Sequence, residues 1–302
     1  MVIPDAVTTL SNNLFSGCSG LTSVTLPSAA TAIGISSFYK CSSLQIINIP
    51  VTLKTIGVNA FSDCTSLTNV SIPSTVTTIG NYAFTNCSAS LVVDNANTKY
   101  SSQNGILFNL DKSTIIQCPI TISGDYSIPE TVKAIGAYSF YNCSKLTSVY
   151  IPVSVPSTGF GDGAFFNCSG LTSIFVPSRT PADLSNSLDV FYNVDKANCI
   201  LNVPIGTKLA YQAANQWSEF SKIVEVATGV DSPLKNTFTV ASVNGQLIIS
   251  GLEVGKTIEI YNLQGILVKS QVSISDSETV NLPTKGIYIV RIGKMTEKIL
   301  NN

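Results

Sequence analysis

One short phrase recurs along this sequence, and its spacing constrains the fold more than any other feature. A clear copy reads IGNYAFTNC, and the related copies occupy residues 56–64, 79–87, 135–143 and 160–168. The cysteine of the phrase returns every 23 residues up to Cys87, and Cys168 follows Cys143 by 25 residues. A fixed period of this length is typical of a solenoid, in which each unit buries its apolar face against its neighbours.

Each unit is predicted to contain a short strand followed by a turn. In the unit that begins at Leu67, Val70 and Ile72 alternate with polar residues, as in a half-buried strand. Pro73 ends this strand because proline has no N–H for the ladder, and Gly80 permits a sharp turn. The residues after it suffice for about one helical or 3₁₀ turn. We therefore expect a β-rich solenoid with one parallel sheet and short helical turns on its convex side.

Two residue types of the phrase are expected to point inward in every coil and to form columns along the solenoid. A disulfide framework or a metal site is the functional alternative for the cysteines, but the sequence has no C-x-x-C pair and its spacing matches no zinc signature. Parallel side chains also suit disulfide geometry badly, so we predict free, buried thiols. The phenylalanine column is Phe15, Phe38, Phe61, Phe84, Phe140 and Phe165, and the cysteine column is Cys18, Cys41, Cys64, Cys87, Cys143 and Cys168.

Two segments interrupt the period. Residues 104–119 read as a β-hairpin, with its turn at 109–112, that protrudes from the coils. Residues 206–220 read as the one convincing helix, which would cap the open end of the solenoid. Its apolar face would carry Leu209, Ala213, Gln216 and Trp217.

The ends of the sequence define the expected domains. The chain begins at the strand-ending Ile-Pro of a repeat, so the solenoid, residues 1–226, is expected to be truncated at its N-terminus. Residues 227–236 are expected to be a linker. Short alternating strands fill residues 237–302, which predicts a small β-sandwich.

Composition excludes several classes of function. Charged residues make up 12% of the chain and the net charge is −1, which argues against a nucleic-acid partner because such proteins need a basic surface. The sequence has no histidine, which removes the usual general base and the imidazole metal ligands. It has no run of apolar residues long enough for a transmembrane segment. No cofactor, metal site or catalytic residue is predicted.

The repeat phrase L-x-x-V-x-I-P…I-G-x-x-A-F-x-x-C resembles the BspA-like, or Treponema pallidum-type, leucine-rich repeats of bacterial surface proteins over residues 3–226. The segments IEIYNLQGILV and LPTKGIYIVRI are similar to the C-terminal sorting domain of the type IX secretion system of Bacteroidetes. These resemblances imply a leucine-rich-repeat solenoid that is secreted or exposed on the outer membrane of a Gram-negative bacterium. The resemblance to the repeat family also implies binding to host matrix proteins or to other cells, as in some relatives.

The leading hypothesis is a surface binding or adhesion module with an extracellular protein or glycan as its partner. A structural spacer or display scaffold is the second, and a glycan-directed enzyme is a remote third. An enzyme of that class needs two carboxylates across a cleft, and Asp125 is the only acid at an outward strand position, so we predict no catalysis.

The candidate binding residues are Tyr150 and Phe175, which lie at outward positions of consecutive strands. Exposed paired aromatics on a polar face can bind a protein or stack on a sugar. The alternatives are that they only stabilise the sheet by cross-strand packing, or that residues 178–198 cover them. The outward positions, counted back from each strand-ending proline, are Thr25, Asn48, Ser71, Ser127, Tyr150, Phe175 and Asn202.

Overall fold

The computed structural model describes residues 1–226, 238–243, 246–252, 255–262, 266–275, 277–283, 286–292 and 295–301. The chain divides into two compact units, Met1–Thr228 and Gly229–Asn302, and each is described here by itself. The expected linker at 227–236 lies outside the described residues.

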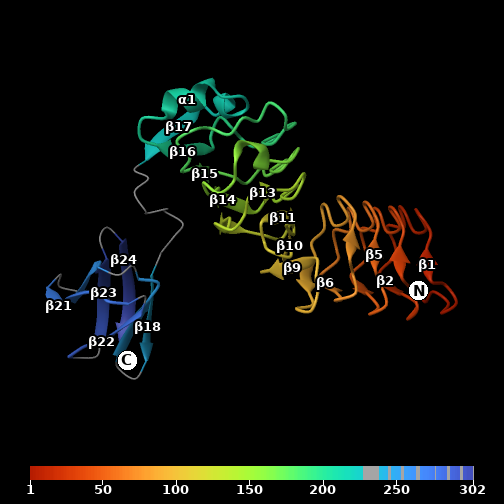
Figure 1. Ribbon diagram of the computed structural model, residues 1–302, viewed down its shortest axis with the longest axis horizontal. Helices are drawn as coiled ribbons and strands as arrows, with labels where there is room; N and C mark the ends of the chain where they lie inside the picture. Colours follow the sequence, from red (N-terminus) through yellow and green to blue (C-terminus); the bar gives the residue numbers. More distant parts are fainter. Residues whose placement is uncertain are drawn as a thin grey trace. The chain divides into compact units, whose positions relative to one another are not determined.

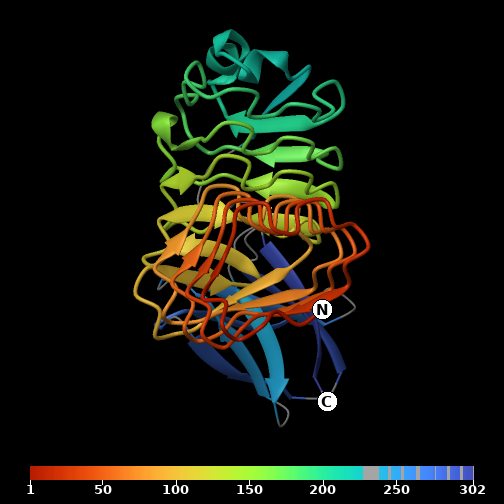
Figure 2. The same ribbon diagram turned by 90° about the vertical axis from the view of Figure 1, so that its right-hand side faces the viewer.

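The first unit is a parallel β-solenoid with very little helix (Figure 1). Its N-terminal coils carry two lines of parallel strands, and their traces nearly superimpose when viewed end-on (Figure 2). In the longer strands the inward residues are in register from strand to strand, as Val24 is with Ile47 and Val70 with Leu91. The longer strands are β2 (Ser23–Thr25), β4 (Ile46–Asn48), β6 (Asn69–Ile72) and β8 (Ser90–Val93); the shorter are β1 (Thr9–Leu10), β3 (Ala32–Ile33), β5 (Thr55–Ile56) and β7 (Thr78–Ile79).

In each coil the segment after the short strand consists of consecutive turns. The sequence predicted one helical or 3₁₀ turn there, and that prediction is wrong. Each coil places two residues in the left-handed region, such as Tyr82 at φ 61° with Asn86 at φ 58°. The next coil repeats this with Tyr138 at φ 53° and Asn142 at φ 59°. Asparagine tolerates positive φ better than most residues, which explains why the phrase ends in Asn-Cys so often.

Phenylalanine forms two stacked columns inside the solenoid. The ring centroids of Phe38 and Phe61 are 5.3 Å apart, and those of Phe61 and Phe84 are 5.4 Å apart, with nearly parallel planes. In the C-terminal coils Phe165 stacks on Phe140 at 4.9 Å and on Phe191 at 5.6 Å. Phe191 lies in the turn of a further coil. The sequence analysis did not predict a coil in residues 178–198.

The cysteines are free, and all except Cys18 are buried. A typical thiol is that of Cys64, whose Sγ donates to the carbonyl oxygen of Phe38 in the previous coil at 3.1 Å. The expectation of burial is wrong for Cys18, which is exposed, and Phe15 beside it is only half-buried. Both lie in the first of the described coils.

The inserted segment is an antiparallel meander rather than a protruding hairpin. Its strands are β9 (Tyr100–Gln103), β10 (Ile106–Asn109) and β11 (Thr114–Gln117), and β11 pairs in parallel with β13 (Ala134–Ile135). Ile106 and Phe108 pack in the core of the C-terminal coils, while Leu107 packs in that of the N-terminal coils. The meander is therefore part of the core, and the line of longer strands is divided there into two parallel sheets, the first of them β2-β4-β6-β8, where a single sheet was expected.

The second parallel sheet contains five strands: β12 (Gly124–Ser127), β14 (Leu146–Tyr150), β15 (Ser173–Phe175), β16 (Ile200–Pro204) and β17 (Lys222–Val226). A one-turn 3₁₀ segment, η1 (Ser157–Gly159), precedes the turns of the coil between β14 and β15.

The cap helix is shorter than expected. Helix α1 spans Lys208–Ala213, and a separate 3₁₀ turn, η2, spans Trp217–Glu219. Leu209 is 82% exposed and Ala213 is exposed, so the predicted apolar face is wrong at both positions. Tyr211 and Trp217 supply the buried surface instead, because the chain turns between α1 and η2.

The second unit contains two antiparallel sheets around a small apolar core. The sheets have the strand orders β18-β19-β22 and β21-β20-β23-β24. Ile258, Ile260 and Val290 are fully buried in this core. The strands are β18 (Thr239–Val243), β19 (Gln246–Ser250), β20 (Thr257–Asn262), β21 (Leu267–Val272), β22 (Ser277–Asn281), β23 (Gly286–Ile292) and β24 (Met295–Asn301).

Candidate functional site

The second parallel sheet places Tyr150 and Phe175 directly opposite each other on β14 and β15. Both side chains are half-buried. The Tyr150 hydroxyl donates to Glu130 Oε1 at 3.4 Å. Burial, together with the Glu130 carboxylate, raises the pKa of Tyr150 to about 12, so its hydroxyl stays protonated at neutral pH. Tyr150 thus presents an apolar ring with a neutral hydroxyl at its tip.

The neighbouring positions of this row are Ser127 on β12 and Asn202 on β16. Asn202 was expected to be solvated, but it is buried. Its Nδ2 donates to Ser173 Oγ at 2.9 Å and to the Ile174 carbonyl oxygen at 3.3 Å, so it ties β16 to β15. A side chain engaged in this way is not available to a ligand.

The parallel row two residues earlier contains Ser148, whose Oγ is buried and has no hydrogen-bond partner within the described residues. Ser148 lies opposite Asp125 on β12 and Ser173 on β15. Asp125 accepts a hydrogen bond from Thr147 Oγ1 at 3.2 Å. The positions across from Asp125 are thus serines, and this row does not supply the second carboxylate that a glycosidase needs.

A second set of aromatic side chains lies on the turns, at positions that sequence reasoning did not single out. We call Tyr82, Tyr138, Tyr141, Phe166 and Tyr192 the outer aromatic stripe. Phe166 stacks on Tyr192 at 4.4 Å and on Tyr141 at 5.4 Å, and Tyr138 meets Tyr82 edge-on at 5.5 Å. Tyr82 is 37% exposed and Tyr192 is 51% exposed, while the other members are half-buried. The signal was present in the sequence, because an aromatic residue follows the column phenylalanine in three successive coils.

Two carboxylates flank the outer aromatic stripe. Asp162 Oδ1 accepts a hydrogen bond from the Leu188 N–H at 2.8 Å, and its carbonyl oxygen accepts one from the Tyr138 N–H at 2.8 Å. Asp189 follows Leu188 and is exposed. Partial burial raises the pKa of Tyr138, and Tyr82 and both aspartates add to this effect.

Gly163 explains how the Tyr138 ring reaches the next coil. Gly163 has φ +56°, and a Cβ there would lie 2.4 Å from Tyr138 Cε1. The ring therefore rests on the glycine backbone, and any larger residue at this position would displace it.

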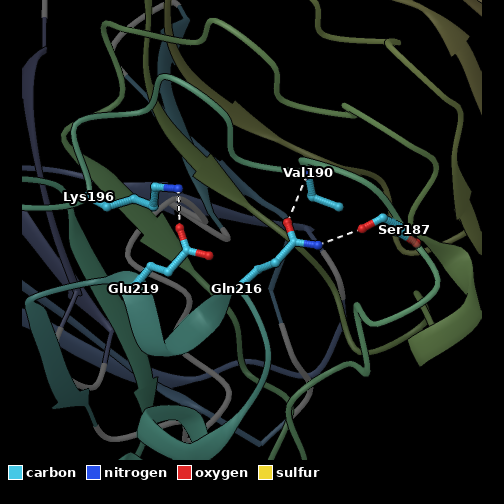
Figure 3. A network of polar contacts seen from close by, with 5 residues as sticks. All are labelled: Ser187, Val190, Lys196, Gln216 and Glu219. Carbon is cyan, nitrogen blue, oxygen red and sulfur yellow. Dashed lines mark hydrogen bonds and ion pairs between the residues drawn. The ribbon is translucent and has the colours of Figure 1, made fainter.

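Gln216 closes the C-terminal end of the solenoid (Figure 3). Its Oε1 accepts from the Val190 N–H at 2.8 Å, and its Nε2 donates to the carbonyl oxygens of Leu184, at 3.0 Å, and Ser187. In the coil before it, the N–H that corresponds to that of Val190 bonds within its own coil, as the Ala164 N–H does to the Gly161 carbonyl oxygen at 3.2 Å. The Gln216 amide thus bridges the Val190 N–H and the Ser187 carbonyl oxygen in the last turn, and an exposed ion pair between Lys196 and Glu219 lies beside it.

The described residues hold no group of three or more metal-ligating side chains. Within the same residues, no helix has the length and apolar character needed to cross a membrane.

Comparison with known proteins places the repeats in a family. A family model described as the BspA type leucine rich repeat region matches in six copies over residues 1–106 and 117–211. No curated protein matches the sequence.

Solved structures with a similar fold share little sequence. A leucine-rich repeat protein from Eubacterium ventriosum is 21% identical with a TM-score of 0.46, and the match covers 67% of this chain and 65% of that one. A leucine-rich cell surface protein from Faecalibacterium prausnitzii is 19% identical with a TM-score of 0.41, over 76% of this chain and 79% of that one. The pneumococcal vaccine antigen PcpA is 16% identical with a TM-score of 0.44, over 75% and 79%. Because the family model matches most of the solenoid, this chain belongs to the BspA-type leucine-rich repeat family.

Proposed function

We propose that this protein is a secreted or surface-exposed binding module that recognises an extracellular protein or glycan. The observation that carries the proposal is the pair Tyr150 and Phe175, which lies half-buried on a sheet whose other outward residues are mostly small and polar. Aromatic side chains with a polar tip are enriched at recognition surfaces.

Membership in the BspA-type family supports a location outside the cell, and the relative from Faecalibacterium prausnitzii is a cell surface protein. We further propose that the C-terminal β unit acts as a sorting domain of the type IX kind in a Gram-negative bacterium of the Bacteroidetes. The main competitor is a display scaffold without its own ligand.

The test compares the wild-type chain with a Tyr150→Ser, Phe175→Ser double variant on arrays of extracellular matrix proteins and of glycans. We expect the wild type to bind a discrete set of spots and the double variant to lose those spots while its circular dichroism is unchanged. A Thr25→Ala, Ser71→Ala variant, changed on the other parallel sheet, serves as the control and should bind normally. An array with no bound spot for the wild type would favour the scaffold.

A further inference from the structure

The outer aromatic stripe is a second surface with its own chemistry. It lies on the turns of the coils, whereas Tyr150 and Phe175 are the last residues of strands β14 and β15. Its rings form a continuous series of contacts across four coils, from Tyr82 to Tyr192. Packing between coils explains the buried parts of these rings. It does not explain why Tyr192 and Tyr82 leave so much of their surface in water.

The charged side chains of the turns that carry this surface are all negative. The four turn segments that carry the stripe, residues 79–87, 135–143, 160–168 and 187–194, contain two aspartates and no lysine or arginine. The aspartates are Asp162, whose carbonyl oxygen accepts from the Tyr138 N–H and whose Oδ1 accepts from the Leu188 N–H, and Asp189, which follows Leu188. The ring faces of tyrosine and phenylalanine also carry negative electrostatic potential, so carboxylates and rings attract the same kind of group.

The protein itself places a cation against an equivalent ring. Tyr39 follows the column residue Phe38, just as Tyr141 follows Phe140. Lys40 Nζ lies 5.1 Å from the centroid of the Tyr39 ring. In the later coils the position of Lys40 is held by asparagine, as at Asn142, so the rings of the outer aromatic stripe have no such lysine beside them in sequence.

We propose that the outer aromatic stripe, with Asp162 and Asp189, binds a lysine- or arginine-rich segment of a partner protein. Side-chain cations of the partner lie over the exposed edges and faces of Tyr82 and Tyr192, and the two carboxylates pair with neighbouring cations. This inference rests on the proposed binding function and names the partner's chemistry at a site other than the Tyr150 and Phe175 pair. A neutral glycan is the competing occupant, and it would use the rings without the carboxylates.

The probe is a fluorescent decapeptide in which arginines alternate with glycine and serine, and a matched peptide carries citrulline in place of arginine. Citrulline keeps the shape of arginine but has no charge, so it isolates the electrostatic contribution. We expect the arginine peptide to bind the full chain with a Kd below about 1 mM and to bind more weakly as salt is raised. We expect the citrulline peptide to bind at least about fivefold more weakly, since each exposed ion pair or cation–π contact contributes modestly.

Two variants locate the site. Asp162→Asn with Asp189→Asn removes both charges, and asparagine at 162 can still accept the Leu188 N–H; we expect at least about a fivefold loss of affinity. Tyr192→Ser removes the most exposed ring of the stripe and should also weaken binding. The matched control is Asp111→Asn with Asp183→Asn, which changes the net charge equally away from the stripe and should bind like the wild type.

The inference is overturned if the arginine peptide does not bind, if citrulline binds equally well, or if the stripe variants and the control behave alike. The array experiment separates this result from the proposed function. A spot that needs Tyr150 and Phe175 but not Asp162 and Asp189 would leave the binding function in place and assign it to the sheet site alone.

Discussion

Replacing Gln216 by methionine tests how the solenoid is closed at its C-terminal end. Methionine has nearly the length and shape of glutamine but neither accepts from the Val190 N–H nor donates to the carbonyl oxygens of Leu184 and Ser187. Residue 216 has φ 62° in the native chain, and this backbone cost is common to both side chains. The substitution therefore isolates the hydrogen bonds.

The expected cost follows from burial. Val190 and Leu184 are fully buried, so water cannot replace the lost amide without opening the cap. Leaving one buried donor or acceptor unmet costs about 1–3 kcal/mol, and more than one group is affected here. We expect the free energy of unfolding of the cap to fall by about 2–4 kcal/mol.

Trp217 provides the assay, because it is the only tryptophan and it is buried next to the substituted residue. Urea unfolding followed by its fluorescence should shift to lower urea, and more than the far-UV circular dichroism does, because terminal coils of a repeat array can unfold separately. Lys196→Met is the control. It removes the exposed ion pair with Glu219 and should cost less than about 1 kcal/mol. A Gln216→Met loss below about 1 kcal/mol, or one equal to the control, would refute this account of the cap.

Four further predictions concern the coils of the solenoid. Phe61→Ala should lower the free energy of unfolding by about 3–5 kcal/mol, because the ring is fully buried between two stacked neighbours; a loss below about 1 kcal/mol in urea unfolding would contradict the column. Thiol labelling of the native protein should modify Cys18 quickly and the buried thiols only on unfolding, and rapid labelling of several thiols would show that the coils are open. Burial raises the pKa of Cys41 from 9.0 to about 11, so its contribution to stability is present below pH 9 and lost as pH rises towards 11; Cys41→Ala should make unfolding less dependent on pH in that range, and an unchanged slope would contradict this. Gly80→Ala should destabilise strongly, since a Cβ there would lie 2.4 Å from the Val58 backbone nitrogen; wild-type stability in urea would mean that the coils are not so closely spaced.

The repeat could be read from the sequence because its signals are local and periodic. Proline, glycine, phenylalanine and cysteine each have a conformational or volume requirement that is met once per coil, so their common period predicts the solenoid without any partner. The strands and the inward columns follow from that period, and Phe38 and Cys64 are buried as such positions require. The antiparallel strands after residue 237 were likewise visible as alternation between polar and apolar residues.

The features that the sequence did not decide depend on neighbours that are distant along the chain. The turn after Gly80 was expected to be helical, but backbone hydrogen bonds to the next coil stabilise left-handed turns instead, as between the Phe61 N–H and the Ala83 carbonyl oxygen. Leu209 was predicted to be buried because leucine is apolar. It is exposed because the chain turns after α1 and buries Trp217 instead. The exposure of Cys18 follows from its place in the first coil.

Of the two candidate binding surfaces, the sequence predicted one, and the other needed the tertiary structure. Strand periodicity placed Tyr150 and Phe175 on one face of the sheet, and their register as direct neighbours agrees with that placement. The outer aromatic stripe needed the tertiary structure, since only the stacking of coils brings Tyr82, Tyr138 and Tyr192 into one series although they are far apart in the chain. The sequence by itself determined the unit, its period and its buried columns, because these depend on local conformation and volume. Only the tertiary structure decided how the ends are closed and which side chains meet on the surface, because those contacts depend on the coil that lies next in space.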